Sequence, residues 1–270
     1  MNSLTDCYKL SNGVEIPCIG FGTWQTPDGD VCVSSVLSAI EAGYRHIDTA
    51  QGYGNEESVG LAVKKSGIDR KDLFITSKLT NSEHGYERTL AAFEETMKKL
   101  DMDYLDLYLI HWPNPIAFRD HWQEANAGTW KAFEELYKAG RIRAIGISNF
   151  RPHHIEELMK TATVAPMVNQ IRLCPGETQD EVVDYCRSHN IQLEAYSPLG
   201  VGKIGKSIAQ ICIRWSLQRG YLPLPKSVTP SRIKENTQVF DFELEAADVQ
   251  LIADLKGCVG YSSDPDTTTF

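Results

Sequence analysis

Short apolar runs alternate with stretches of helical apolar spacing along almost the whole chain of 270 residues. The runs predict eight strands, at residues 18–22, 46–48, 74–78, 105–110, 144–148, 168–170, 193–196 and 222–224. The helical stretches predict helices at residues 30–42, 56–65, 87–100, 129–138, 152–160, 180–188, 207–218, 232–238 and 246–255. Eight strands that are each followed by a helix favour a closed parallel (β/α)8 TIM barrel over an open doubly wound sheet. We therefore predict an α/β fold with one domain over residues 1–270.

The two ends of the chain add elements to this repeat. Asn12-Gly13 is a strong turn signal between two short extended stretches, so a β-hairpin is expected ahead of the barrel. At the other end, the last helix is followed by a tail over residues 257–270. An open nucleotide-binding sheet is disfavoured, because Gly20-Phe21-Gly22 begins a G-x-G-x-x-G pattern but Gln25 stands where the third glycine belongs.

Charge and cysteine content exclude some classes of partner. The formal net charge is −9 at pH 7 and the isoelectric point is near 5.3, which argues against nucleic acid and against an anionic membrane surface. The chain has seven cysteines and no C-x-x-C pair, which is typical of reduced thiols in a cytoplasm. No apolar run approaches membrane-spanning length. We expect a cytoplasmic monomer with no membrane or nucleic-acid partner.

Ionisable residues follow three consecutive predicted strands, at the end where such barrels carry their active sites. Asp48 and Lys78 end two of these strands, Tyr53 lies in the loop after Asp48, and His111 follows the next strand. Each residue alone has a structural explanation: the lysine could extend along the surface, and the histidine and tyrosine could pack in the core. Packing alone rarely places four such groups at neighbouring strand ends.

The four side chains fit proton transfer to a carbonyl oxygen. A phenol with a pKa near 10 is a poor acid at neutral pH, but a neighbouring ammonium group lowers that pKa, and a carboxylate holds the ammonium group in place. We therefore expect Tyr53 to be the general acid, with Lys78 and Asp48 tuning it. A neutral His111 could donate a hydrogen bond to the carbonyl oxygen. The oxygen then gains a proton while the carbon gains a hydride.

The segments that carry these residues resemble the aldo-keto reductase family, and the resemblance covers nearly the whole chain. The matching segments are residues 43–50, 75–78, 104–113, 145–150 and 225–227. The resemblance is to small bacterial members, similar to 2,5-diketo-gluconate reductases and glyoxal or methylglyoxal reductases. It implies that Asp48, Tyr53, Lys78 and His111 form a catalytic tetrad.

The resemblance also implies a pocket for a nicotinamide cofactor. Ser148, Asn149 and Gln170 match residues that hold the nicotinamide carboxamide, and Tyr196 matches the aromatic residue that stacks on the ring. Alternatively, Ser148-Asn149 could cap the helix that begins near Pro152. Further cofactor contacts are implied for Gly22, Thr23, Trp24, Asp48, Ser197, Leu199, Ser227, Val228, Glu235 and Asn236.

Two basic residues in the matching adenosine-phosphate site decide the expected cofactor. Lys226 and Arg232 both favour a 2′-phosphate, so NADPH is expected in preference to NADH. A basic residue that complements a helix end is the structural alternative.

The chain departs from the family pattern at two places. Only residues 201–204 stand where the family has a longer stretch that folds over the cofactor pyrophosphate, so we expect this clasp to be reduced. The second departure is at positions 172 and 174, where relatives usually carry Glu and His and this chain carries Arg and Cys. Because Gln170 is retained, we expect carboxamide binding to be retained as well.

The expected substrate is a small carbonyl compound, namely an aldehyde, an α-dicarbonyl or a keto-sugar. Trp24, Trp112 and Trp122 are predicted in loops at the same rim, where they would form an aromatic-walled pocket with Tyr53 and His111. Trp24, Tyr53, His111 and Trp112 are the predicted substrate contacts. The connection over residues 113–128 and the tail over residues 257–270 are the expected specificity elements.

Two other classes of function fit part of the pattern. A metal-dependent barrel hydrolase could use Asp48 and His111, but the sequence has no H-x-H or H-E-x-x-H, and Lys78 would repel a cation, so no metal is expected. A non-catalytic NADPH-sensing subunit could keep the cofactor pocket without turnover. The segment at residues 146–150 is not a nucleophile elbow, because the final glycine of G-x-S-x-G is absent.

Overall fold

The computed structural model describes residues 1–196, 206–255 and 263–269. Eight parallel strands form one sheet in the order β10-β9-β8-β7-β6-β5-β4-β3. Gly20 N donates to Pro223 O at 3.0 Å and Gly22 N donates to Pro225 O at 3.2 Å, which brings the first and last strands together. The strands are β3 (Phe21–Gly22), β4 (His46–Asp48), β5 (Phe74–Leu79), β6 (Leu105–Ile110), β7 (Ile142–Ser148), β8 (Val168–Arg172), β9 (Gln192–Tyr196) and β10 (Leu222–Leu224). The predicted (β/α)8 barrel is confirmed.

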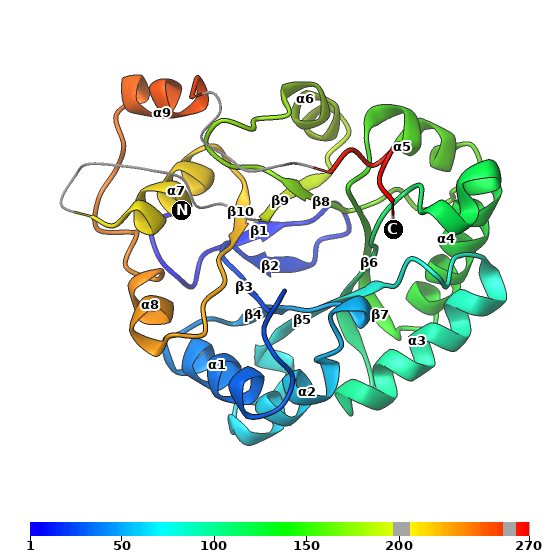
Figure 1. The fold of residues 1–270 in the computed structure, drawn as a ribbon, viewed down its shortest axis with the longest axis horizontal. Coiled ribbons are helices and arrows are strands. Elements are labelled where there is room, and N and C mark those ends of the chain that lie inside the picture. The colour runs from blue at the N-terminus through cyan, green and yellow to red at the C-terminus, as the bar shows by residue number, and fades with distance from the viewer. Residues whose placement is uncertain (197–205, 256–262, 270) are drawn as a thin grey trace.

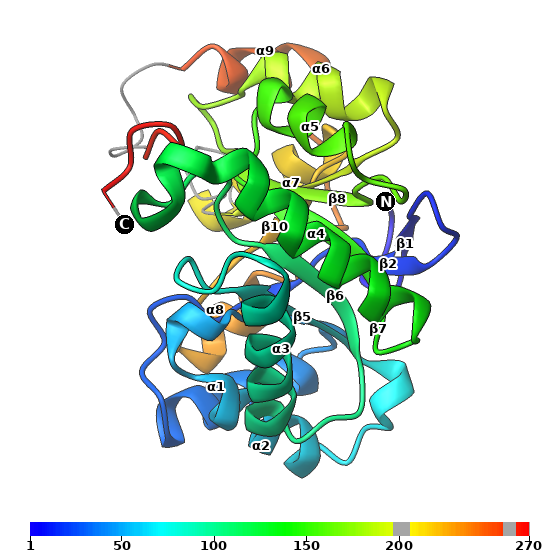
Figure 2. The ribbon, with the colours of Figure 1, turned by 90° about the vertical axis from the view of Figure 1, so that its right-hand side faces the viewer.

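Helices surround the sheet (Figure 1). They are α1 (Asp30–Glu41), α2 (Glu56–Lys65), α3 (Tyr86–Leu100), α4 (Trp122–Lys138), α5 (Pro152–Met159), α6 (Asp180–Ser188), α7 (Ile208–Gln218), α8 (Pro230–Glu235) and α9 (Ala246–Ala253). Neighbours along the chain are neighbours in space, as α3 and α4 show on the outer wall (Figure 2). None of the helices in the described parts of the chain is both long enough and apolar enough to cross a membrane.

The strands are buried on both faces, which explains why they read as continuous apolar runs. All residues of β5 and β6 are buried, and Tyr108, Phe93 and Phe133 pack between β6 and the helices outside it. Small residues allow the close approach of neighbouring strands. A Cβ on Gly146 would lie 2.7 Å from Val168 O, so this position on β7 requires glycine.

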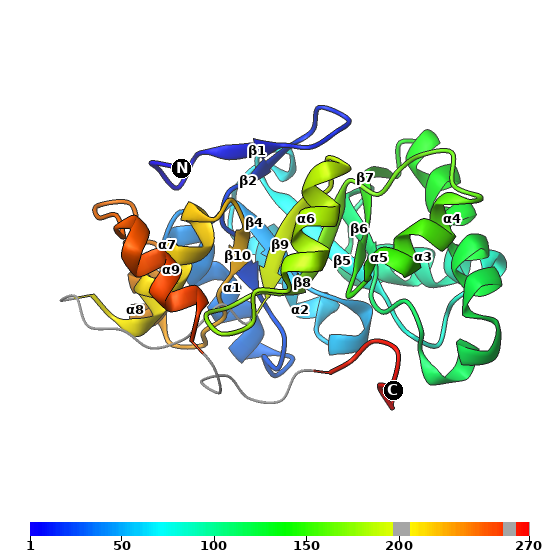
Figure 3. The ribbon, with the colours of Figure 1, turned by 90° about the horizontal axis from the view of Figure 1, so that it is seen from above.

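The N-terminal hairpin and the C-terminal tail lie at opposite ends of the barrel (Figure 3). The hairpin strands β1 (Cys7–Lys9) and β2 (Glu15–Pro17) pair antiparallel, as predicted. Asn12 Nδ2 donates to Arg143 O at 2.9 Å, at the start of β7. The described tail residues instead contact the segments that follow β6 and β7, because Arg119 donates to Thr268 O and Arg151 pairs with Asp266.

Several predicted boundaries were wrong, and two of them lie in segments that lead to the site. The strand expected at residues 18–22 pairs only at Phe21–Gly22. The connection expected over residues 113–128 contains the 3-10 helix η3 (Ile116–His121) and the first two turns of α4, which begins at Trp122 and not at Thr129. Gly128 therefore lies inside a helix. A Cβ there would come within 3.1 Å of Tyr86 N, so this glycine serves the packing of α4 against α3 and does not mark a helix start.

Candidate active site

The centre of the site is the fully buried ammonium group of Lys78 on β5. It donates to Asp48 Oδ1 at 2.7 Å, to Thr49 O at 2.9 Å and to Tyr53 OH at 3.3 Å. An ammonium group has three N–H donors, so all of them are used. Asp48 ends β4, and Tyr53 ends the short 3-10 helix η1 (Gln51–Tyr53). The structure thus brings together three of the four predicted ionisable residues.

The Tyr53 phenol is protonated at neutral pH. Burial raises its pKa, Lys78 opposes this effect, and Asp48 adds to it, so the net direction is upward. The expectation that Lys78 lowers the pKa below its usual value was therefore wrong, because burial outweighs the ammonium group. The phenol oxygen accepts a hydrogen bond from Lys78, which leaves the phenol O–H as a donor. An acid that must deliver a proton benefits from being protonated before the reaction.

His111 follows β6 and faces the phenol. Its ring centroid lies 5.7 Å from that of Tyr53, at an interplanar angle of 72°. Burial, together with nearby Lys78 and His84, lowers the pKa of His111 to about 3. The imidazole is therefore neutral at physiological pH and can donate a hydrogen bond to a carbonyl oxygen without carrying a charge.

Amide and hydroxyl groups line the next strands around the barrel. Asn149 Nδ2 donates to His111 O at 2.9 Å, and Tyr196 OH donates to Asn149 Oδ1 at 2.9 Å. Ser148 Oγ donates to Gln170 O at 2.8 Å. Asn149 has a φ of 63°, in the left-handed region that asparagine tolerates. These bonds tie the ends of β6, β7, β8 and β9 together.

The alternative role of Ser148-Asn149 as a helix cap is wrong, since the N-cap of α5 is Arg151. In that cap, Arg151 N donates to His154 Nδ1 at 3.2 Å. Arg172 is one of the two residues of the second expected departure from the family pattern. It pairs with Glu177 at 3.0 Å in the loop after β8, so its charge is balanced there.

A second polar layer lies deeper in the barrel and was not among the predicted site residues. His46 Nε2 and Thr76 Oγ1 are 2.9 Å apart, and Gln170 Nε2 donates to Glu194 Oε2 at 2.7 Å. Glu194 is fully buried. The sequence contains a signal for this layer. His46, Thr76 and Glu194 each precede a rim residue by two positions, and residues two apart on a strand share a face.

The loop after β3 packs directly on Asp48. Thr23 donates to Asp48 O at 3.0 Å from both its backbone N–H and its hydroxyl group, which fixes the segment that follows Gly22.

The predicted rim tryptophans differ in exposure, since 55% of the Trp24 surface and only 8% of the Trp112 surface are exposed. Trp122 lies at the start of α4 and not in a loop, and it packs edge-on against His154, with ring centroids 5.0 Å apart. Ser197, Leu199 and the short connection over residues 201–204 lie outside the described residues.

The predicted adenosine-phosphate site lies after β10 and on α8. Lys226 and Arg232 pair with no carboxylate of the described residues. Ser227 Oγ accepts from Thr229 N at 3.1 Å. Val228 is exposed, Glu235 is half-buried and Asn236 is buried. Two cations without an ion-pair partner among the described residues, in one loop and the helix after it, are chemically suited to an anionic ligand.

His153, His154 and Asp266 are the one group in the described ranges whose side chains could together hold a metal ion. Their arrangement is that of a contact between α5 and the tail. Because His154 Nδ1 accepts from Arg151 N, His154 Nε2 carries the proton and donates to Asp266 Oδ1 at 2.8 Å. Arg151 pairs with the other carboxylate oxygen at 3.1 Å. The group lies far from Asp48 and Lys78 along the chain.

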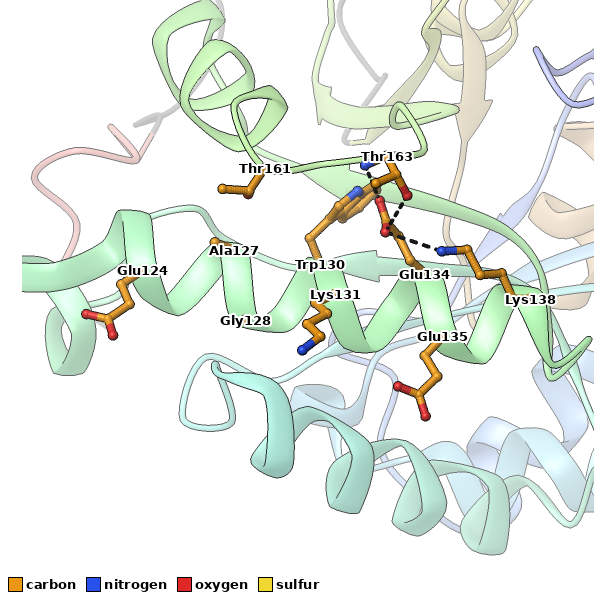
Figure 4. Close-up of a pocket in the computed structure, with 10 residues that line it drawn as sticks. All are labelled: Glu124, Ala127, Gly128, Trp130, Lys131, Glu134, Glu135, Lys138, Thr161 and Thr163. Atoms are coloured by element: carbon orange, nitrogen blue, oxygen red, sulfur yellow. Dashed lines mark hydrogen bonds and ion pairs between the residues drawn. The ribbon is translucent and has the colours of Figure 1, made fainter.

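A hollow of about 740 Å³ lies along the outer face of α4 (Figure 4). None of the residues that line it belongs to the predicted site. Glu134 faces the loop before β8, where it accepts from Thr163 N at 2.6 Å, from Thr163 Oγ1 at 2.7 Å and from Val164 N at 2.8 Å. These hydrogen bonds provide acceptors for the polar groups of the loop, so Glu134 has a structural role.

Known sequences and structures resemble this chain along most of its length. The sequence model described as "Aldo/keto reductase family" matches residues 18–205 and 203–256. The two matches overlap at residues 203–205. The chain is 48% identical to the glyoxal reductase of Bacillus subtilis over 281 residues, covering 99% of each chain. It is 42% identical to the methylglyoxal reductase DkgA of Escherichia coli over 273 residues, covering 96% of each chain.

A solved structure with a bound cofactor is also similar to this chain. The Bombyx mori aldo-keto reductase in complex with NADP is 34% identical, with a TM-score of 0.82, and the match covers 92% of each chain.

Proposed function

This chain belongs to the aldo/keto reductase family, and from that membership we propose that it reduces a small aldehyde or ketone to an alcohol with NADPH and Tyr53. The observation that carries the proposal is the triple hydrogen bonding of Lys78. Its ammonium group holds the phenol oxygen of Tyr53 while Asp48 balances the charge. The phenol O–H is then the group that can donate to a substrate at the rim.

The other residues of the proposed site have separate roles around the phenol O–H of Tyr53. When bound, NADPH supplies the hydride. Tyr53 donates its proton to the carbonyl oxygen as negative charge grows there, and Lys78 stabilises the phenolate that is left. The neutral His111 donates a second hydrogen bond and orients the carbonyl group. The contact between Lys78 and Asp48 also disfavours a metal-dependent hydrolase, because the ammonium group lies against the carboxylate that a metal ion would need.

The proposed cofactor site has suitable polar, aromatic and basic side chains at its nicotinamide end and at its 2′-phosphate end. Gln170 and Asn149 offer amide groups for the carboxamide of the nicotinamide, and Tyr196 offers a ring for stacking. Lys226 and Arg232 are the cations for the 2′-phosphate, which supports NADPH over NADH. The bound NADP of the Bombyx mori relative supports the same assignment. Further contacts are proposed from Gly22, Thr23, Trp24, Asp48, Ser148, Ser227, Val228, Glu235 and Asn236.

We propose a small α-dicarbonyl compound or aldehyde as the substrate class. The support is that two relatives bear the names glyoxal reductase and methylglyoxal reductase. Trp24, Tyr53, His111 and Trp112 are the proposed contacts. A small dicarbonyl compound needs few apolar side chains around it, and this requirement fits a rim where Trp24 is exposed and Trp112 is buried. A monomer in the cytoplasm stays a prediction.

The test is the loss of NADPH absorbance with a panel of α-dicarbonyls, simple aldehydes and keto-sugars. The proposal expects turnover with at least one α-dicarbonyl, and no loss of activity on treatment with a chelator. Saturable NADPH binding without turnover on the whole panel would instead favour the non-catalytic sensing function. A metal ion bound to the purified protein, with no NADPH consumed on the panel, would favour the hydrolase class.

A further inference from the structure

Glu194 is a buried carboxyl group for which the proposed mechanism has no task. It lies on β9, directly opposite Gln170 on β8 in the sheet register, and none of its side chain is exposed. Its Oε2 accepts one N–H of the Gln170 amide at 2.7 Å. Asp48 Oδ2 accepts the other N–H of the same amide at 2.8 Å. The amide nitrogen of Gln170 is therefore held between two carboxyl groups.

The balance of buried charge requires that one of these carboxyl groups is neutral. Lys78 is the cation in contact with Asp48, at 2.7 Å. Glu194 has no such contact, since the nearest basic group is His46 Nε2 at 4.0 Å, and burial together with Lys78 lowers the pKa of His46 to about 3. An ionised Glu194 would be a buried charge without a counterion, which is costly. Burial and the nearby Asp48 raise the pKa of Glu194 to about 8, although Gln170 and Lys78 oppose this shift.

We propose that Glu194 is a positioning residue for cofactor recognition. As a neutral carboxyl group it accepts one N–H of Gln170 while Asp48 accepts the other, so Gln170 can offer the nicotinamide carboxamide only its carbonyl oxygen. This inference rests on the proposed function, in which Gln170 binds that carboxamide.

The orientation of the Gln170 amide follows from its two partners. A turn of the amide by half a rotation would place its carbonyl oxygen against Asp48 Oδ2 and Glu194 Oε2, where the ionised Asp48 repels it. Asp48 alone would fix one N–H and leave the second without an acceptor inside the barrel, which is unfavourable. Glu194 is the acceptor for this second N–H group. The carbonyl oxygen then accepts from the carboxamide N–H of the cofactor and fixes which face of the nicotinamide meets the substrate.

The test compares NADP⁺ with its 3-acetylpyridine analogue, which has a methyl group where the carboxamide has its amino group. Loss of one hydrogen bond in the wild type should weaken binding of the analogue by about tenfold, measured by protein fluorescence titration. Glu194→Gln keeps a neutral carbonyl acceptor and should discriminate as the wild type does. Glu194→Met removes the acceptor, so discrimination should fall to about threefold or less.

Equal discrimination by Glu194→Met and wild type overturns the inference. Discrimination that is lost in Glu194→Gln as well also overturns it, because a neutral acceptor would then be insufficient. A wild-type protein that binds neither nucleotide refutes the proposed function itself, and the inference with it. Binding of NADP⁺ by the wild type separates the two failures.

A second measurement covers the case in which Glu194→Met does not fold. The groups that face Glu194 are Gln170, Asp48, Lys78 and His46. The pKa of Lys78 is raised and that of His46 is lowered to about 3, so we assign a change of charge near pH 8 to Glu194. The affinity for NADP⁺ relative to NADPH should rise above this pH in the wild type, because an ionised Glu194 attracts the cationic ring. The ratio should stay flat in Glu194→Gln. Identical pH profiles for the two proteins would contradict the inference.

Discussion

The two ends of the proposed site differ in how their charges are paired. Around Lys78 the cation, its carboxylate and the phenol are in contact inside the barrel, with every ammonium N–H used. Around Lys226 and Arg232 the cations are at the surface and pair with no carboxylate in the described ranges. The first end is organised without a ligand, whereas we expect the second to gain an ionic partner when the proposed cofactor binds. Chemistry and cofactor choice should therefore respond separately to mutation.

Tyr53→Phe should have the largest effect, and it tests the preorganised end. The variant should bind NADPH like the wild type but lose about 10²–10⁴-fold in the rate of carbonyl reduction, because the proton donor is gone. Single-turnover reduction by enzyme preloaded with NADPH measures this step. A rate within about threefold of the wild type would identify another acid, with His111 as the candidate.

Lys78→Met should reduce stability as well as activity. It leaves Asp48 as an unpaired buried carboxylate, so the free energy of unfolding should fall by about 3–5 kcal/mol. Urea denaturation measures the change. The double variant Asp48→Asn/Lys78→Met is the matched control, which should recover part of the stability and none of the activity. A Lys78→Met protein as stable as the wild type would show that the pair is not organised as described.

Arg232→Ala tests the exposed end. We expect NADPH binding to weaken by about tenfold to a hundredfold and NADH binding to change little, because the lost contact is to the 2′-phosphate. Lys64→Ala, at an exposed basic residue elsewhere that already pairs with Asp101, is the control. Equal weakening of both cofactors would remove Arg232 from the 2′-phosphate site.

The pH dependence of stability gives the smallest effect and concerns the buried end alone. Burial lowers the pKa of His84 to about 4, below the unfolded value of 6.5, so its contribution is complete above pH 6.5 and is lost as the pH falls. Between pH 7.5 and 5 the wild type should lose about 1–2 kcal/mol more than His84→Gln. Glu194 acts in the opposite direction, so the difference between the two proteins is the quantity to measure. Parallel stability curves would place His84 in contact with solvent.

The barrel and the grouping of the four ionisable side chains were predictable because both follow from local pattern. The strands are apolar runs, and Asp48, Lys78 and His111 stand where those runs end. The start of α4 was not predictable from local pattern, because Gly128 is required by the approach of Tyr86, a residue more than forty positions away. The direction of the Tyr53 pKa was missed for a related reason. Sequence shows which charges are neighbours, but burial depends on the closed barrel.

The deeper polar layer could have been found by counting back two positions from each rim residue. His46 and Thr76 precede Asp48 and Lys78 in this way, and Glu194 precedes Tyr196. What sequence does not provide is the partner of each group. The bond from Gln170 to Asp48 spans 122 positions in the chain. Such a contact depends on closure of the sheet.

The hairpin suggests a way to attach the protein to a surface or a dye. Cys7 on β1 is exposed, while the other cysteines in the described parts of the chain are buried. The hairpin lies at the end of the barrel away from the tail, and therefore away from the rim that carries Tyr53 and His111 (Figure 3). A thiol-reactive electrode coating or fluorophore coupled to Cys7 would hold the molecule by the hairpin end, with the rim that carries Tyr53 and His111 turned toward the solution.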